Sequence, residues 1–303
     1  MSFVIPKTTS LVIDAGSRFV KIGYAGDHHP FVVHDTTQSH NTVDSIVKYI
    51  EKYSKEFDVD SFIVIESQKQ NLESRKKIVQ QVFVKRLCES VLFLRSPLCD
   101  AFGHGKISCT VLGCSASTLS ASVILNGKIV ESIFHPKGSL FLEEDILREV
   151  EKLNVKTELG LPTGNLPRLI LESEDLIRRI EDEYKIDVFK SVKDEVFSLI
   201  DNIIEMRNKY NINKKNVANG CIILSGGMFK YKPFFAMAKM QLTGKLGEDF
   251  SDFILRDNNL DCTFFGASLV GSNDCSKTLF ISSYDFQKSG MDAVKFKSID
   301  AVE

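Results

Sequence analysis

The stretch LVIDAGSRFVKIGYAGD, Leu11 to Asp27, decides the fold. An apolar run ends at Asp14, a short turn follows, and a second apolar run leads into another glycine-rich turn, which predicts two antiparallel strands. Gly16 lets backbone N–H groups approach an anion, Ser17 adds a hydroxyl, and Lys21 directs a cation back at the turn. Asp14, at the end of the first strand, offers a carboxylate that could hold a metal through water. The pattern therefore predicts a phosphate-binding hairpin, although an ordinary glycine turn gives the same short pattern.

Composition indicates an ordinary soluble globular chain. The 303 residues are 43% hydrophobic and 26% charged, with a net charge of −2, so no electrostatic footprint for nucleic acid or a membrane surface is present. The seven cysteines form no CxxC pair, which favours reduced thiols in the cytosol or nucleus over disulfides or a zinc site. We expect no signal peptide in MSFVIPKTTS and no membrane-spanning run.

Hydrophobic periodicity predicts an alternation of helices and strands, and hence an α/β sheet covered by helices. Helices are expected at 41–57, 72–87, 143–152, 171–184 and 191–210, and strands at 61–65, 91–94 and 222–224. A second pair of strands is expected over 110–130, turned at Asn126-Gly127, and a loop over 160–167. The apolar stripes on these helices indicate core packing.

Three segments together resemble the actin family. The first is Leu11 to Asp27, the second runs from Val217 to Leu242, and the third is CTFFGASLVGSNDCSKTLFISSYDFQKSG, Cys262 to Gly290. The resemblance implies the actin-like, ribonuclease H-like duplicated fold, with a nucleotide cleft between two halves. It assigns 1–95 and 260–303 to the smaller half and 96–259 to the larger half.

The resemblance also implies a set of nucleotide-binding residues. These are Asp14, Gly16, Ser17, Lys21, Ser225, Gly226 and Gly227. They would hold ATP or ADP with weakened affinity, or the glycines would survive for their backbone conformation alone. No catalytic residue and no metal ligand is assigned.

Several groups on which actin-type hydrolysis depends are absent. Gly113 and Ala116 stand where actins carry two aspartates, and Ser96 stands where they carry a glutamine. Arg18 replaces a glycine in the first loop, and Leu260 replaces a lysine near the adenine. Phosphoryl transfer depends on positioned metal and polar groups, so these losses predict a degenerate, non-catalytic ATPase site.

The chain also lacks an insertion that conventional actins carry. Residues 34–41 form only a short polar stretch between Phe31-Val32-Val33 and the first predicted helix, so subdomain 2 is largely deleted, and the short region before Cys221 indicates a reduced subdomain 4. Among actin-related proteins this resembles the pointed-end subunits of dynactin. The implied role is a cytoplasmic, cytoskeletal cap. Its partners are then actin-like filament subunits and the other pointed-end proteins of dynactin, with no direct nucleic acid and no membrane.

Two other roles stay open at this point. One is a nuclear actin-related subunit of a chromatin-remodelling complex, and the other is a divergent ATP-binding actin. For the cap, we expect the contact with the filament to include Tyr284 to Met291, with Phe286 and Met291 as apolar candidates, and the hinge near Arg95 to Ala101.

Overall fold

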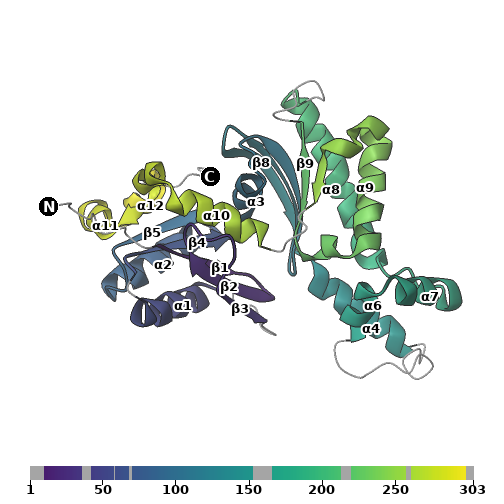
Figure 1. Ribbon diagram of the computed structural model, residues 1–303, viewed down its shortest axis with the longest axis horizontal. Helices are drawn as coiled ribbons and strands as arrows, with labels where there is room; N and C mark the ends of the chain where they lie inside the picture. The colour runs from purple at the N-terminus through teal and green to yellow at the C-terminus, as the bar shows by residue number, and fades with distance from the viewer. Residues whose placement is uncertain are drawn as a thin grey trace. The chain divides into compact units, whose positions relative to one another are not determined.

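A computed structural model describes residues 10–35, 42–57, 59–67, 70–152, 166–212, 220–256 and 261–297 (Figure 1). The chain divides into two compact units, each with its own mixed sheet and covering helices, so the fold is α/β. Unit 1 comprises residues 1–107, 126–129 and 261–303, and unit 2 comprises residues 108–125 and 130–260. Leu260 and Val217 to Asn219 lie outside the described residues.

Unit 1 is built on a six-stranded mixed sheet of order β11-β5-β4-β1-β2-β3. Its strands are β1 (Ser10–Ala15), β2 (Phe19–Tyr24), β3 (Val32–Asp35), β4 (Ser61–Glu66), β5 (Ser90–Arg95) and β11 (Ile281–Ser282). The first three run antiparallel in succession, whereas β4 and β5 run parallel to β1. The continuous burial of β4 fits a strand covered on both faces.

Helices cover both faces of this sheet (Figure 1). They are α1 (Val43–Glu56), α2 (Leu72–Val84), α3 (Ser96–Gly103), α10 (Cys262–Ser272), α11 (Ser283–Ser289) and α12 (Asp292–Phe296). On one face, α1 and α2 pack on alternate residues of β1, β4 and β5, and on the other face α3 and α10 pack on the residues between them. A side chain at Gly266 of α10 would meet the carbonyl oxygen of Cys99 at 1.8 Å, so glycine allows the two helices to touch.

Unit 2 contains a five-stranded sheet of order β10-β9-β6-β7-β8. Its strands are β6 (Cys109–Cys114), β7 (Leu119–Leu125), β8 (Lys128–His135), β9 (Ile222–Ser225) and β10 (Ile254–Arg256). β6 pairs antiparallel with β7 and parallel with β9, and β9 pairs parallel with β10. The turn between β7 and β8 uses Asn126 and Gly127 with φ of 50° and 73°, the left-handed values that a two-residue hairpin needs.

The helices of unit 2 pack mainly on one face of its sheet. They are α4 (Ser139–Lys152), α6 (Leu166–Glu172), α7 (Glu174–Tyr184), α8 (Lys190–Lys209) and α9 (Lys232–Leu246), with short 3-10 turns at Gly227–Lys230 and Glu248–Phe253. One hydrophobic core joins α8 and α9 to β6, β7 and β9. The apolar stripe of α8, with Val192, Val196, Ile200 and Ile203 all fully buried, lies in this core.

The two sheets repeat one strand order. In unit 1 it is β3-β2-β1-β4-β5, and in unit 2 it is β8-β7-β6-β9-β10, each with antiparallel pairing of the first two strands and two parallel strands beside the first. The repeats differ between the third strand and the next crossing helix. In unit 2 this connection carries α4, α6 and α7, whereas in unit 1 β3 ends at Asp35 and α1 begins at Val43.

Most predicted elements are confirmed, and several boundaries are corrected. The expected strand pair over 110–130 is wrong as a pair, because a turn at Ser115 to Thr118 divides it into β6 and β7 before the Asn126 turn. The helix expected over 171–184 is two helices, since Ser173 leaves the first and caps the second. Leu166 and Pro167 are helical instead of part of a loop, whereas 160–165 lie outside the described residues. Residues 96–107, assigned from sequence to the larger half, pack in unit 1 through α3.

Candidate functional site

The seven predicted binding residues divide between the two units. Asp14, Gly16, Ser17 and Lys21 belong to the β1–β2 hairpin of unit 1; in unit 2, Ser225 ends β9 and is followed by Gly226 and Gly227.

The hairpin of unit 1 closes its turn with backbone groups. The Gly16 N–H donates to the carbonyl oxygen of Phe19 at 2.9 Å, and a side chain at Gly16 would lie 2.7 Å from that same oxygen. Glycine is therefore needed for the tightness of the turn itself. The N–H of Gly16 itself is used inside the hairpin.

A cluster of charges lies at the end of this hairpin. Lys21 lies opposite Asp14 in the register of β1 and β2 and is 7% exposed. Its Nζ lies 3.4 Å from Oδ1 of Asp261, the residue before α10, and Oδ2 of Asp261 lies 3.2 Å from Nδ1 of His29. Burial raises the pKa of Asp14; Lys21 opposes this shift and Asp261 adds to it. Sequence reasoning missed Asp261 and His29, because neither forms a local pattern with the hairpin.

The corresponding hairpin of unit 2 is neutral. Its turn is closed by two hydroxyl residues: the Ser115 N–H donates to the Thr118 carbonyl at 2.9 Å, and the Thr118 N–H donates to the Ser115 hydroxyl at 3.1 Å. The Ser115 and Thr118 hydroxyls lie 2.7 Å apart. On β6, a side chain at Gly113 would meet the Ser120 hydroxyl at 2.7 Å. The hydroxyl pair fixes the turn without any acidic group.

The start of α4 lies against the same turn. The Ser139 and Leu140 N–H groups donate to the carbonyl oxygens of Ser115 and Ala116, both at 3.0 Å, which satisfies orphan donors at the helix start. A side chain at Gly138 would approach these carbonyls to 2.4–2.6 Å. The turn is thus held between its own hydroxyls and a helix.

Of the two glycines after β9, the structure requires glycine at 226 but leaves room for a side chain at 227. Gly226 has a φ of 103°, and a side chain there would meet the Cys114 carbonyl oxygen at 2.3 Å. Gly226 therefore serves both the backbone conformation and the close packing of β9 on the second hairpin. At Gly227 an added Cβ meets no heavy atom within 4 Å. Ser225 is buried and pairs with Gly113 in the sheet.

Several of these groups are engaged within the protein and are therefore not free donors for a nucleoside triphosphate. In unit 1 the cation expected to meet phosphate pairs with Asp261, and the glycine N–H is used within the turn. In the second hairpin the Ser115 and Thr118 N–H groups bond inside the turn, and Gly113 and Ala116 bring no carboxylate. Among the described residues, no group of three or more His, Cys, Asp or Glu side chains is placed to hold a metal ion.

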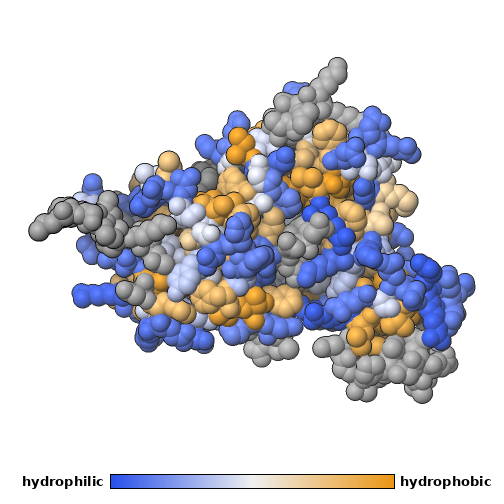
Figure 2. Space-filling view, in the orientation of Figure 1, coloured by the Kyte–Doolittle hydropathy of each residue, from blue (hydrophilic) through white to orange (hydrophobic). Residues whose placement is uncertain are grey.

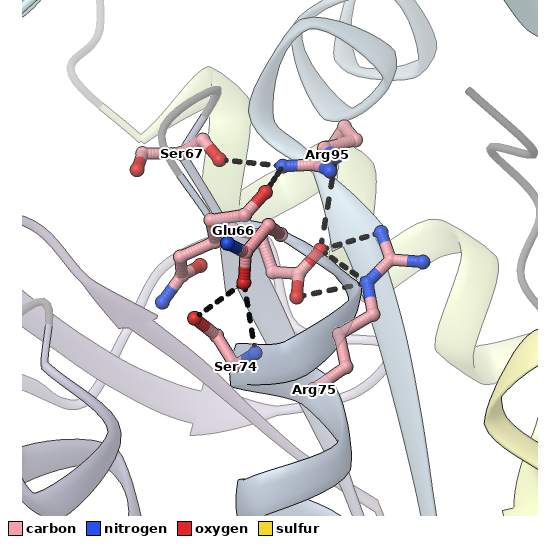
Figure 3. A network of polar contacts seen from close by, with 7 residues as sticks. Glu66, Ser67, Ser74, Arg75 and Arg95 are labelled. Atoms are coloured by element: carbon pink, nitrogen blue, oxygen red, sulfur yellow. Dashed lines mark hydrogen bonds and ion pairs between the residues drawn. The ribbon is translucent and has the colours of Figure 1, made fainter. Parts of the chain in front are cut away.

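Next to Ser96, the carboxyl ends of β4 and β5 carry a buried polar network (Figure 3). Glu66 is fully buried and Arg75, on α2, is 3% exposed; Arg75 Nη2 donates to Glu66 Oε2 at 2.6 Å. Arg95 Nη1 donates to the carbonyls of Ser67 and Gln70 at 2.8 and 2.6 Å, and its Nε lies 3.8 Å from Glu66 Oε2. The network fixes the strand ends from which α3 begins.

The surface of the chain carries two features relevant to partners. In unit 2, Leu140, Leu147 and Leu169 are between 37% and 38% exposed, and apolar side chains gather over α4 and α6 in Figure 2. In unit 1, Tyr284 on α11 is 68% exposed. Phe286, which the sequence leaves open as a contact residue or a core residue, is partly buried and packs on Phe83, with ring centroids 5.6 Å apart.

Comparison of the sequence with models of known protein families and with curated proteins gave no match. Within the described part of the chain, no helix has both the length and the apolar composition needed to cross a bilayer.

Proposed function

We propose that the chain is a non-catalytic, actin-related structural subunit that caps the pointed end of the actin-like filament of dynactin. The observation that carries the proposal is the repeated strand order of the two sheets. A three-stranded meander followed by two parallel strands, present twice, is the plan of the ribonuclease H-like duplicated fold to which actins belong. The resemblance of Leu11 to Asp27 falls on the first hairpin of this plan.

The place where the repeats differ supports the role of a cap. Unit 2 carries α4, α6 and α7 between its third strand and α8, whereas unit 1 passes from Asp35 to Val43 without an added helix or strand in its described part. In an actin-like subunit, an insertion at this place of each half forms the pointed end. A subunit lacking it in one half offers little surface on which a further subunit assembles, and so it ends a filament.

The geometry of both hairpins supports a non-catalytic role. Phosphoryl transfer needs a positioned metal and polar groups that stabilise the developing charge. In the second hairpin, Gly113 and Ala116 stand at the positions where carboxylates would be needed, and the Ser115 and Thr118 hydroxyls close the turn. Residues that once served a nucleotide then persist because the turns depend on them, as Gly16 and Gly226 do.

The experiment is affinity purification of the tagged full-length chain from cells, followed by mass spectrometry and electron microscopy of the recovered assemblies. We expect dynein–dynactin subunits, with the chain at one end of a short filament. Recovery of chromatin-remodelling subunits from nuclei would support the nuclear alternative. Filaments of the chain alone, formed in salt and magnesium, would support a divergent polymerising actin.

A matched pair of variants tests the proposed contact face. Tyr284→Glu places a charge on the most exposed apolar side chain of α11. An interface stable enough for a filament end buries at least about 1,000 Å² and depends on apolar anchors. We expect Tyr284→Glu to lower incorporation with an unchanged melting temperature, whereas Lys288→Glu on the same helix tests whether charge alone has this effect. Normal incorporation of folded Tyr284→Glu would place the contact elsewhere.

A further inference from the structure

Lys21 is a buried cation in a place where a cation needs a partner. Its side chain is 9% exposed, and its residue lies opposite Asp14 in the β1–β2 ladder. Moving an ammonium group out of water is costly unless an opposite charge or good hydrogen bonds compensate it. Asp261 supplies an opposite charge, with its Oδ1 3.4 Å from Nζ of Lys21.

The side chain of Asp261 does not cap its own helix. Asp261 is the N-cap residue of α10, and its carbonyl accepts the Phe265 N–H at 2.7 Å, but its side chain makes no capping bond. Asp is among the residues preferred at this position because its carboxylate accepts an N–H of the first turn. The carboxylate of Asp261 instead lies between Lys21 and His29, at 3.4 and 3.2 Å.

Other helices of the chain show the ordinary arrangement. Thr42, Asn71, Ser173 and Ser282 stand at the N-caps of α1, α2, α7 and α11, and each side chain accepts a backbone N–H of its own helix. Asp261 differs from these four N-cap residues, because its carboxylate lies near Lys21 and His29 and accepts no N–H of its own helix.

We propose that the Asp261 carboxylate forms an ion pair with Lys21 and thereby excludes phosphate from the hairpin of unit 1. A phosphate at Lys21 would have to displace this carboxylate, and it would then meet two negative charges, those of Asp261 and Asp14. The inference deepens the proposed function and rests on it, because it names what prevents an actin-like hairpin from binding nucleotide. The exclusion is electrostatic and depends on one side chain.

The experiment measures binding of Mg-ATP and, separately, of inorganic pyrophosphate to the full-length chain by isothermal titration calorimetry. Asp261→Asn removes the charge, and Asp261→Ser removes it while supplying a favoured capping side chain, so this second variant protects the start of α10. Asp274→Asn, an aspartate 91% exposed in the same unit, is the matched control. Lys21→Met combined with Asp261→Ser tests whether any gain depends on Lys21.

We expect both Asp261 variants to bind both probes at least about tenfold more tightly than the unchanged chain, a gain that the double variant loses and the control lacks. A folded Asp261→Ser variant without gain overturns the inference. A gain in affinity that persists in the double variant, which lacks Lys21, also overturns the inference. Failure of both single variants to fold overturns it too, because Asp261 would then be needed for folding alone. Failure of the proposed function is seen separately, when the unchanged chain does not enter the filament complex.

Discussion

Glu66 and Arg75 form a buried, bidentate ion pair: Arg75 Nε donates to both carboxylate oxygens of Glu66, at 3.0 and 2.8 Å. Arg95 approaches the same carboxylate from β5, at 3.8 Å. The buried carboxylate of Glu66 thus lies close to two guanidinium groups. Removing one partner of such a group leaves the rest as uncompensated buried charge, and this cost exceeds the net stability of the intact pair.

We therefore expect Glu66→Gln to lower the free energy of unfolding by about 3–5 kcal/mol. Urea denaturation at neutral pH measures the change. Glu73→Gln on α2, the helix that carries Arg75, is the control, since Glu73 is 66% exposed and its pair with Lys76 lies at the surface. Equal stability of the two variants would mean that the buried network tolerates the lost charge.

The two glycines after β9 are predicted to respond differently to alanine. Gly226→Ala meets the Cys114 carbonyl and an unfavourable φ, and we expect a loss of about 2–4 kcal/mol. Gly227→Ala enters open space and should change stability by less than about 1 kcal/mol. Urea denaturation of both variants measures the difference. A large loss at Gly227 would contradict the distinction drawn between them.

The raised pKa of Asp14 predicts that its contribution to the free energy of unfolding decreases as the pH rises. Its pKa is raised in the folded chain by burial, so the folded state binds more protons than the unfolded state above the ordinary pKa of 3.8. Its contribution is therefore complete below that value and is lost as the pH rises through the raised pKa. We expect Asp14→Asn to remove this loss, so the variant is more stable than the unchanged chain at neutral pH. Denaturation curves across the acid range measure it.

Asp285 is the control, because its pKa is lowered in the folded chain and its effect on stability therefore depends on pH in the opposite direction. Burial alone would raise its pKa, but hydrogen bonds from Lys297 at 2.7 Å and from Ser282 more than offset this and hold the pKa at about 2. Its stabilising contribution is present above the ordinary pKa and is lost as the pH falls toward about 2. Asp285→Asn should lower stability at neutral pH and flatten the acid limb. Parallel behaviour of the two variants would contradict these assignments.

The final prediction concerns hydrolysis. We expect the purified chain to release no phosphate from ATP above background, because neither Gly113 nor Ala116 brings an acidic side chain to the second hairpin. A coupled phosphate-release assay tests this, with a conventional actin as the positive control. Release at a rate comparable to that control would contradict the non-catalytic role.

Local pattern was enough to predict most helices and strands. The apolar stripe of α1 and its Thr42 cap, the buried run of β4, and the Asn126-Gly127 turn each follow from residues close in sequence. The turn at Ser115 to Thr118 carries only a weak signal in the sequence, because hydroxyl side chains close it without glycine or proline.

The candidate site was harder to predict because its partners come from distant segments. The hairpin residues 14–21 were found from their own spacing, but Asp261 reaches Lys21 from the start of α10. Nothing within a short window of sequence indicates that pairing. The need for glycine at 226 likewise depends on the carbonyl of Cys114, which only the register of β6 and β9 brings close.

The discontinuous path of unit 1 determines the order in which a ribosome can complete the two units. The core of unit 2 consists of residues between Leu112 and Ile254, so it is fully synthesised before α10. One face of the first sheet, including Val12, Ile63 and Leu92, packs on Cys99 of α3 and on Phe264 of α10, which is made after unit 2. Until α10 is synthesised, α3 alone of these two helices can cover this face, while unit 2 already has its whole core. The first sheet is therefore synthesised before unit 2 but completes its packing after it, and a nascent chain released before α10 exposes part of an apolar sheet face.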